Sequence, residues 1–353
     1  MGKVALIIGC TGATGTPLAE QLLRLPDWKV YGAARRVPQF RAEVALDKFN
    51  HVALDLADAR AVHQQFGSLT DITHVFYCAN HRDANTNTAM LRNVLDAVEQ
   101  AAPGFDNIAL MQGTKYYGCN LGPFKTPAQE SDPRVAGCDF YYQEEDLVRE
   151  RQSGRGWGHT AVRPHSVCGY AAGNPMNLAV VLAIYGAMLR ELGMPFGFPA
   201  SEACYDRLFQ VSDADLLARA SIWAASTPAC RGEAFNITNG QPFRWRELWP
   251  ALAAFFELPA AGPQPLPLAR FLERNAGLWN DMVRRYRLKA FPYERVARWV
   301  DGDYRVPNSR FACEYDIVSD VEKARRYGFD ETLDNGRMFV ELFERFRRAR
   351  VIP

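Results

Sequence analysis

The chain has 353 residues, enough for about two domains of average size and for a sizeable buried core. Hydrophobic residues make up 48% of it and charged residues 23%, which argues against a mainly disordered or fibrous protein. The 41 Lys and Arg balance the 40 Asp and Glu to a net charge of +1. Without an overall positive field, the chain is not expected to bind nucleic acid or an anionic membrane surface.

Eight cysteines are spread along the chain without a CxxC pair or a Cys/His cluster. They are too sparse for a disulfide scaffold and lack the spacing of a zinc site, so we expect free thiols in a reducing cytoplasm and no metal. The first apolar run, residues 4–8, is too short for a signal peptide. No stretch approaches the length of a membrane span, and no membrane association is predicted.

Short apolar, β-branched runs alternate with helical patterns along the first two thirds of the chain, which is typical of a parallel α/β sheet. Strands are predicted at residues 4–8, 29–33, 51–54, 74–77, 108–111, 160–162 and 234–237, and helices at 17–25, 87–101, 141–151 and 212–225. Ser212 is expected to cap the last of these helices, with Asp213 and Asp215 near its positive end.

The second half of the chain is mostly helical in pattern. Residues 177–192 predict a long apolar helix, 258–268 a proline-rich connector, 270–285 and 320–327 further helices, and 336–350 an amphipathic basic helix. We therefore predict an α/β fold with a Rossmann-type, doubly wound parallel sheet in residues 1–165, to which residues 206–238 return. Residues 166–205 and 239–353 are predicted to form a smaller, mostly helical C-terminal cap that binds the substrate.

A glycine-rich turn follows the first predicted strand and opens the first helix. Its spacing is GxxGxxG, in which the first glycine permits the tight turn, the second lets a pyrophosphate approach, and the third lets helix and strand pack. A glycine triplet alone is often only a loop, but its place between strand and helix favours a dinucleotide site. The predicted cofactor contacts in this turn are Gly9, Thr11, Gly12, Ala13, Thr14 and Gly15.

The end of the second strand indicates which dinucleotide binds. An acidic residue at this point would accept hydrogen bonds from the ribose and repel a 2′-phosphate, but the chain has Arg35 and Arg36 instead. Two guanidinium groups can pair with a phosphate dianion, which predicts NADPH/NADP+ as the cofactor. Asp55 and Leu56, after the third strand, are expected beside the adenine, although an Asp at a strand end is also an ordinary cap.

A short-chain dehydrogenase normally carries Tyr-x-x-x-Lys, whose tyrosine exchanges a proton with the carbonyl oxygen while the lysine lowers the tyrosine pKa. The corresponding stretch here is Tyr141-Tyr142-Gln143-Glu144-Glu145, so a glutamate stands where the lysine is expected. Taken alone, this stretch indicates either an inactive site or merely the aromatic start of a helix.

Two motifs taken together are more specific. The stretch Gln112-Gly113-Thr114-Lys115-Tyr116-Tyr117 with Gly122-Pro123-Phe124, followed by Phe140-Tyr141-Tyr142-Gln143-Glu144-Glu145-Asp146, resembles the progesterone 5β-reductase and iridoid synthase-like (PRISE) family of extended short-chain dehydrogenases. The resemblance runs nearly the full length of the chain, through residues 30–36, 73–77, 92–97, 176–178, 212–216, 222–225 and 233–240.

The resemblance implies that Lys115, after the fifth strand, and Tyr141 are the catalytic residues, and that the activity is NADPH-dependent reduction of the C=C bond of activated enones. In such a reduction negative charge grows on the carbonyl oxygen, where a protonated tyrosine stabilises it. No tyrosinate is needed, so Glu145 is compatible with enone reduction and unfavourable for alcohol oxidation. Read separately, without the family resemblance, Lys115 is better interpreted as a solvated loop lysine and Tyr141 as a core aromatic.

Further cofactor contacts are predicted after later strands, where His165 and Ser166 replace the Gly-Asn usual in the family. His165 is expected to touch cofactor or substrate, or to be a satisfied polar residue. The remaining predicted contacts are Cys78, Ala79, Met111, Pro164 and Val167.

The predicted substrate pocket is apolar, with Phe124, Tyr117 and Tyr205 as lining residues. Trp279 and Trp299 are weighed as well, but tryptophans are more often plain core. The chain departs from the family in the inserted residues 119–121 and in the less aromatic residues 298–301. Both departures fall at the expected pocket, so small enones are predicted rather than a steroid or monoterpenoid.

Three functions remain open from the sequence. The first is an NADPH-dependent enone reductase, and the second is a sugar-nucleotide epimerase or dehydratase, disfavoured because those enzymes keep the missing lysine. The third is a non-catalytic NADP-sensing regulator, which would have little use for Lys115 together with Tyr141. The helices leave a homodimer open.

Overall fold

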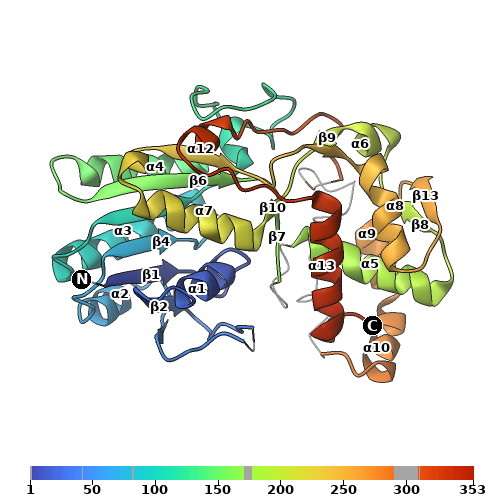
Figure 1. Ribbon diagram of the computed structural model, residues 1–353, viewed down its shortest axis with the longest axis horizontal. Coiled ribbons are helices and arrows are strands. Elements are labelled where there is room, and N and C mark those ends of the chain that lie inside the picture. Colours follow the sequence, from blue (N-terminus) through green and yellow to red (C-terminus); the bar gives the residue numbers. More distant parts are fainter. Residues whose placement is uncertain (1, 42, 82, 171–176, 290–308, 310) are drawn as a thin grey trace.

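Figure 1 shows the computed structural model, which describes residues 2–41, 43–81, 83–170, 177–289, 309 and 311–353. A parallel sheet with its helices forms one half of the molecule, and a mostly helical body forms the other. Helix α13 (Asn335–Arg348) stands between the two halves.

The sheet has seven parallel strands in the order β11-β6-β5-β4-β1-β2-β3. This order reverses between β1 and β4, as in the Rossmann fold, and the predicted fold class is confirmed. The strands are β1 (Lys3–Ile8), β2 (Trp28–Ala34), β3 (Phe49–Ala53), β4 (His74–Tyr77), β5 (Asn107–Met111), β6 (Gly158–Pro164) and β11 (Ala234–Ile237).

Alternate residues of β1 pack into two separate hydrophobic clusters, one on each face of the sheet. Ala5 and Ile7 join the cluster beneath α1 and α7, whereas Leu6 and Ile8 join the cluster beneath α2 and α3. Because both faces are covered, the strand is apolar throughout rather than alternating. The helices that cover the sheet are α1 (Gly15–Leu23), α2 (Ala59–Phe66), α3 (Ala84–Ala101), α4 (Asp139–Gln152) and α7 (Ala214–Ser226).

The cap of helix α7 differs from the prediction. Asp213, not Ser212, is the N-cap, and its carboxylate accepts hydrogen bonds from the Asp215 and Leu216 N–H groups. Ser212 belongs to the two-residue strand β10 (Ser212–Asp213), which pairs with β7 (Val167–Cys168). Its hydroxyl donates to the Ile237 carbonyl oxygen at 2.7 Å, so it holds the sheet edge instead of the helix end.

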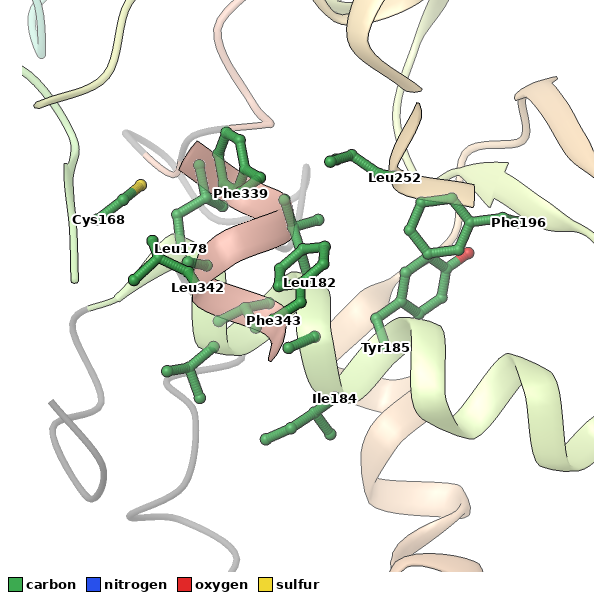
Figure 2. Packing of buried hydrophobic residues seen from close by; sticks show 14 of the residues in the cluster. Cys168, Leu178, Leu182, Ile184, Tyr185, Phe196, Leu252, Phe339, Leu342 and Phe343 are labelled. Atoms are coloured by element: carbon green, nitrogen blue, oxygen red, sulfur yellow. The ribbon is translucent and has the colours of Figure 1, made fainter. Parts of the chain in front are cut away.

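The helical half is built around α5 (Leu178–Leu192), whose residues 178–189 are all buried. Figure 2 shows Leu178 and Leu182 of α5 packed close to Phe339, Leu342 and Phe343 of α13. A helix that is apolar on all sides is expected where other elements surround it, which explains its uniform sequence. The surrounding elements include α8 (Trp245–Phe255), α9 (Leu268–Arg274) and α10 (Ala276–Arg285).

Several elements in this half differ from the prediction. The stretch at 258–268 contains a strand, β13 (Ala260–Pro263), which pairs with β8 (Phe196–Phe198). The helix predicted at 270–285 is two helices that meet at Asn275. Helix α8 was not predicted, and it contains Pro250.

Part of the C-terminal region packs on the sheet rather than in the cap to which it was assigned. Helix α12 (Glu322–Arg326) lies against β11, and Ala324 and Phe329 share a cluster with Phe235. Lys323 also pairs with Glu233 at 2.6 Å. The chain therefore crosses back to the sheet before it forms α13.

Candidate active site

The predicted cofactor residues lie where the parallel strands end. The Cys78 N–H donates to the Ile8 carbonyl oxygen and the Gly9 N–H to that of Ala33, each at 2.9 Å. These bonds join the ends of β1, β2 and β4 at the point where the strand order reverses. In open α/β sheets, ligands bind in the crevice at this point.

The glycine turn comes close to neighbouring backbone. Gly9 has a φ of +84°, and a methyl group on it would lie 2.9 Å from the Ala79 nitrogen. A methyl group on Gly15 would overlap the Gly9 carbonyl oxygen. Thr14 precedes α1 without a side-chain cap, and the Thr16 N–H donates to the Gly12 carbonyl oxygen of the turn at 3.1 Å.

Two thiols lie behind this turn. Burial raises the pKa of Cys10 and of Cys78 to about 12, although a hydrogen bond with the Thr14 side chain opposes the change at Cys78. Both groups therefore stay protonated at neutral pH. They pack as small apolar side chains rather than acting as nucleophiles.

Arg35 and Arg36 are both exposed after β2, and within the described part of the chain neither forms an ion pair. Asp55 is exposed after β3 and accepts a hydrogen bond from the Ala57 N–H at 3.0 Å, as an ordinary turn cap does. Leu56 is 8% exposed and belongs to the core beneath α3.

The Tyr141 hydroxyl lies at the ends of β5 and β6. A methyl group on Gly113 would be 3.1 Å from this hydroxyl oxygen and 3.5 Å from the Pro164 carbonyl oxygen. The tyrosine is half-buried in the first turn of α4, with its ring edge-on to Phe140. The hydroxyl group is therefore next to the strand end that leads into Lys115.

Lys115 is an exposed residue in a short 3-10 turn, η1 (Thr114–Tyr117), whose other three residues are buried. The Thr114 hydroxyl donates to the Pro164 carbonyl oxygen at 3.1 Å, and Gly118 ends the turn with a φ of +80°. The buried neighbours fix the backbone of Lys115 close to Gly113. The structure thus brings the two predicted catalytic residues to one corner of the sheet.

Arg163, which sequence patterns did not single out, holds this corner together. Its guanidinium carbon lies 3.4 Å from the centre of the Tyr116 ring, and the residue is 2% exposed. Its Nε donates to Gln112 Oε1 at 2.8 Å and its Nη1 to the Tyr117 hydroxyl at 3.1 Å. Tyr117 in turn donates to Asn236 of β11 at 2.7 Å.

Glu145, which replaces the expected lysine, belongs to the same network. It accepts a hydrogen bond from the Tyr116 hydroxyl at 2.8 Å. It also lies 2.5 Å from Arg149 and 3.8 Å from the buried guanidinium of Arg163. The glutamate therefore balances a buried cation, and this position has a structural use that a lysine could not serve.

The loop after β6 lies against both the sheet and the cap. The His165 N–H donates to the Ser212 hydroxyl at 3.0 Å, and its ring meets the Phe209 ring edge-on with centroids 4.6 Å apart. Pro164 ends β6, and Val167 is half-buried in β7. Met111 ends β5 and packs half-buried beneath α7.

The predicted pocket residues have different surroundings. Phe124 is half-buried and packs both on the cap core and on the tyrosine cluster around Tyr116. Tyr117 is 3% exposed with its hydroxyl group bonded inside the protein, so it is placed to support the turn. Tyr205 packs against Phe198 in the cap.

Of the two tryptophans weighed for the pocket, Trp279 is 2% exposed in the cap core. Trp299 lies outside the described residues, as do residues 298–301 around it.

A second buried acid lies on α4, one helical turn beyond Tyr141. Glu144 is 2% exposed, and its carboxyl group accepts a hydrogen bond from the Asn87 side chain at the start of α3. Asn87 Oδ1 in turn accepts from the His81 N–H at 3.0 Å, in the loop after β4. Burial raises the pKa of Glu144 to about 8, so the carboxyl group is mostly protonated at neutral pH.

Within the described residues, no group of three or more His, Cys, Asp or Glu side chains could hold a metal ion. The same part of the chain has no helix that is both long enough and apolar enough to cross a membrane. None of the eight cysteines, all of which lie in the described part of the chain, forms a disulfide.

Comparison with known families agrees with this geometry. The model of the PRISE-like Rossmann-fold domain family matches residues 51–353. The chain belongs to this family. The PRISE-like resemblance found in the two motifs is thereby confirmed.

Named relatives of this PRISE-like chain are oxidoreductases. It is 32% identical to (S)-8-oxocitronellyl enol synthase of Antirrhinum majus and to 3-oxo-Delta(4,5)-steroid 5-beta-reductase of Arabidopsis thaliana, with 99% of this chain and 93% of each relative covered. It is 31% identical to the short chain dehydrogenase gsfE of Penicillium aethiopicum over the full length of both. The protein is an oxidoreductase of the short-chain dehydrogenase/reductase superfamily.

Solved structures share the fold of this PRISE-like chain. A putative epimerase from Burkholderia cenocepacia J2315 has a TM-score of 0.69 at 16% identity and covers 98% of this chain and 99% of its own. The UDP-glucose 4-epimerase of Thermus thermophilus in complex with NAD has a TM-score of 0.66 at 15% identity, with coverage of 98% and 99%. At these identities the likeness concerns the fold alone.

Replacing Glu145 with lysine should destabilise the protein strongly. The new ammonium group would face Arg163 and Arg149, and the Tyr116 hydroxyl would lose its acceptor. Because this breaks a buried ion pair, we expect Glu145→Lys to lower the free energy of unfolding by about 3–5 kcal/mol. Urea unfolding measures this, with the exposed Glu150→Lys of the same helix as control. Equal stability of the two variants would contradict this network.

Glu144 should make stability depend on pH. Its pKa is about 8 in the folded protein against a usual value of 4.5, so unfolding releases a proton between these two values. Stability should therefore fall as pH rises from 5 to 8, by up to a few kcal/mol at about 1.4 kcal/mol per pKa unit.

Glu144→Gln should flatten this part of the profile, because the amide keeps the Asn87 contact and cannot ionise. Unfolding free energies of wild type, Glu144→Gln and the exposed Glu150→Gln would be compared at pH 5, 6.5 and 8. Parallel profiles for wild type and Glu144→Gln would rule out this titration.

Proposed function

We propose that this protein is an NADPH-dependent reductase that saturates the carbon–carbon double bond of small activated enones. The observation that carries the proposal is the position of the Tyr141 hydroxyl beside Gly113, which directly precedes the turn that bears Lys115. Relatives named as a steroid 5-beta-reductase and an enol synthase support it.

NADPH fits the residues at the carboxyl edge of the sheet. A side chain at Gly9 or Gly15 would collide with neighbouring backbone and prevent this tight turn, and the start of α1, which has no side-chain cap, would face the pyrophosphate. Arg35 and Arg36, exposed and without an ion pair in the described chain, would hold the 2′-phosphate. When bound, NADPH supplies the hydride for the reduction.

The chain's own residues stabilise the charge that develops. Tyr141 donates its hydroxyl proton in a hydrogen bond to the substrate carbonyl oxygen, which becomes an enolate oxygen during the reaction. Lys115 holds the nicotinamide ribose or supports Tyr141 through its charge. Phe124 provides an apolar wall that excludes water at the boundary between cap and sheet.

Two further features belong to this proposal. We assign the enzyme to the cytoplasm, a reducing compartment in which its eight cysteines would stay as thiols. The homodimer remains a prediction.

The deciding experiment follows the loss of NADPH absorbance with 2-cyclohexen-1-one and with a 3-oxo-Δ4-steroid, with analysis of the products. A saturated ketone from the small enone supports the proposal. An allylic alcohol as product would show that the enzyme reduces the carbonyl group and not the C=C bond, which would contradict the proposal. Tight NADPH binding without turnover of any enone would favour the regulator instead.

Tyr141→Phe should lose about 10²–10³-fold in kcat, the usual effect of removing an oxyanion hydrogen bond, while the Kd for NADPH stays near normal. Steady-state kinetics and nicotinamide fluorescence measure the two quantities. Tyr286→Phe, on the exposed end of α10, makes the same chemical change as a control. An active Tyr141→Phe enzyme would refute the oxyanion role.

Removing both phosphate arginines should weaken NADPH much more than NADH. Losing charge-assisted hydrogen bonds to a dianion should raise the Kd for NADPH by about 10–100-fold, with a small effect on NADH. Binding titrations of Arg35→Ala/Arg36→Ala test this, with the exposed Arg60→Ala as control. Equal weakening of both cofactors would count against the assignment.

A further inference from the structure

A third arginine from the loop between β2 and β3 is fixed by two carboxylates. The Arg41 N–H donates to Glu20 Oε1 of α1 at 2.7 Å, and its guanidinium also bonds to this carboxylate. Its two terminal nitrogens donate to the two oxygens of Asp215, at 2.9 and 2.6 Å. Asp215 lies in the first turn of α7.

This cluster is largely removed from water. The side chains of Glu20, Arg41 and Asp215 are 2%, 14% and 24% exposed. The attraction within a buried ion pair offsets the cost of desolvating both groups only when their geometry is good. Here the guanidinium of Arg41 meets the Asp215 carboxylate in a bidentate pair and also bonds to Glu20. The loop is therefore held in one position with respect to both helices.

Both helices begin beside the glycine turn. Helix α1 starts at Gly15, the last glycine of the turn. A methyl group on Gly169 would overlap the Ala214 side chain, at the start of α7, and would lie 3.7 Å from the Ala13 carbonyl oxygen. The Arg41 cluster thus ties the loop after β2 to the two elements that frame the pyrophosphate site.

The same loop begins with the two arginines proposed to bind the phosphate. Arg35, Arg36 and Val37 are exposed, and their own side chains do little to fix the loop. Its anchors come later, where Phe40 meets Phe49 edge-on with centroids 4.8 Å apart and Arg41 forms its ion pairs. The position of the phosphate arginines thus depends on the anchored residues that follow them.

We propose that Arg41 is a positioning residue for cofactor selection. Clamped by Glu20 and Asp215, it holds the Arg35–Arg36 turn where a 2′-phosphate can be bound, so the preference for NADPH over NADH depends on a residue that does not touch the phosphate. This inference rests on the NADPH-dependent function proposed above. It adds the residue that sets the geometry of the phosphate site.

Asp215 also offers an internal control. Arg345 of helix α13 lies 3.7 Å from the same carboxylate, and its guanidinium is stacked over Tyr170 at 4.6 Å. This arginine reaches Asp215 from α13, which stands between the two halves of the molecule, and it holds no part of the loop after β2. Arg345→Gln should therefore leave cofactor discrimination unchanged.

The test is a set of binding titrations of NADPH and NADH by nicotinamide fluorescence, with thermal unfolding to establish that each variant is folded. Arg41→Gln should lower the ratio of the NADH Kd to the NADPH Kd by about tenfold, within the usual range of coupling between sites. Arg41→Lys, which keeps the charge, should recover part of the ratio. Asp215→Asn should also lower this ratio of dissociation constants, and it replaces Arg41→Gln in the test if that variant does not fold.

A double-mutant cycle separates positioning from a general loss of stability. In an Arg35→Ala/Arg36→Ala background, Arg41→Gln should change the ratio no further, since the groups it positions are gone. Equal weakening of NADPH and NADH by Arg41→Gln, or a similar fall of the ratio in Arg345→Gln, would overturn the inference. Failure of enone turnover would reject the proposed reaction and leave these binding results standing.

Discussion

The guanidinium of Arg163 is buried where β6 ends, and the chain offsets the cost of removing this charge from water with partners from several elements. Gln112 at the end of β5 and Tyr117 in the following turn accept its hydrogen bonds, and its carbon lies 3.4 Å from the centre of the Tyr116 ring. Glu145 brings the opposite charge from α4. Because these partners share one cation, the turn bearing Lys115 and the helix bearing Tyr141 are held together.

This constraint gives a physical reason for the altered tyrosine motif. A lysine at position 145 would be a second cation beside a buried arginine, so the lysine that we propose for the site has to come from another position. Lys115 meets that condition because it is exposed on a turn whose neighbours, Thr114 and Tyr116, are buried. In the site that we propose, the replacement of Tyr-x-x-x-Lys therefore reflects a rearranged set of charges.

Local pattern was enough to predict the sheet and its edge. Apolar runs mark all seven strands of the sheet, and a parallel sheet brings the residues after them to one side. Contacts between residues that are distant in the sequence could not be predicted from such local patterns. Strand β13 depends on residues 196–198, some sixty positions earlier, and Asp213 caps α7 because Ser212 bonds to Ile237. The sequence predicts that Tyr117 lines the pocket, but in the structure its hydroxyl donates a hydrogen bond to Asn236 inside the protein.

The ion pairs show how the balanced net charge is distributed over the structure. Glu20 and Glu145 are buried carboxylates that each hold an arginine from another element, Arg41 in one case and Arg163 in the other. The buried arginines are thus neutralised by carboxylates next to them, whereas Arg35 and Arg36 are charged and exposed at the surface. A net charge of +1 gives a polyanion little to bind, yet Arg35 and Arg36 form the local positive pair that we propose to bind a single phosphate.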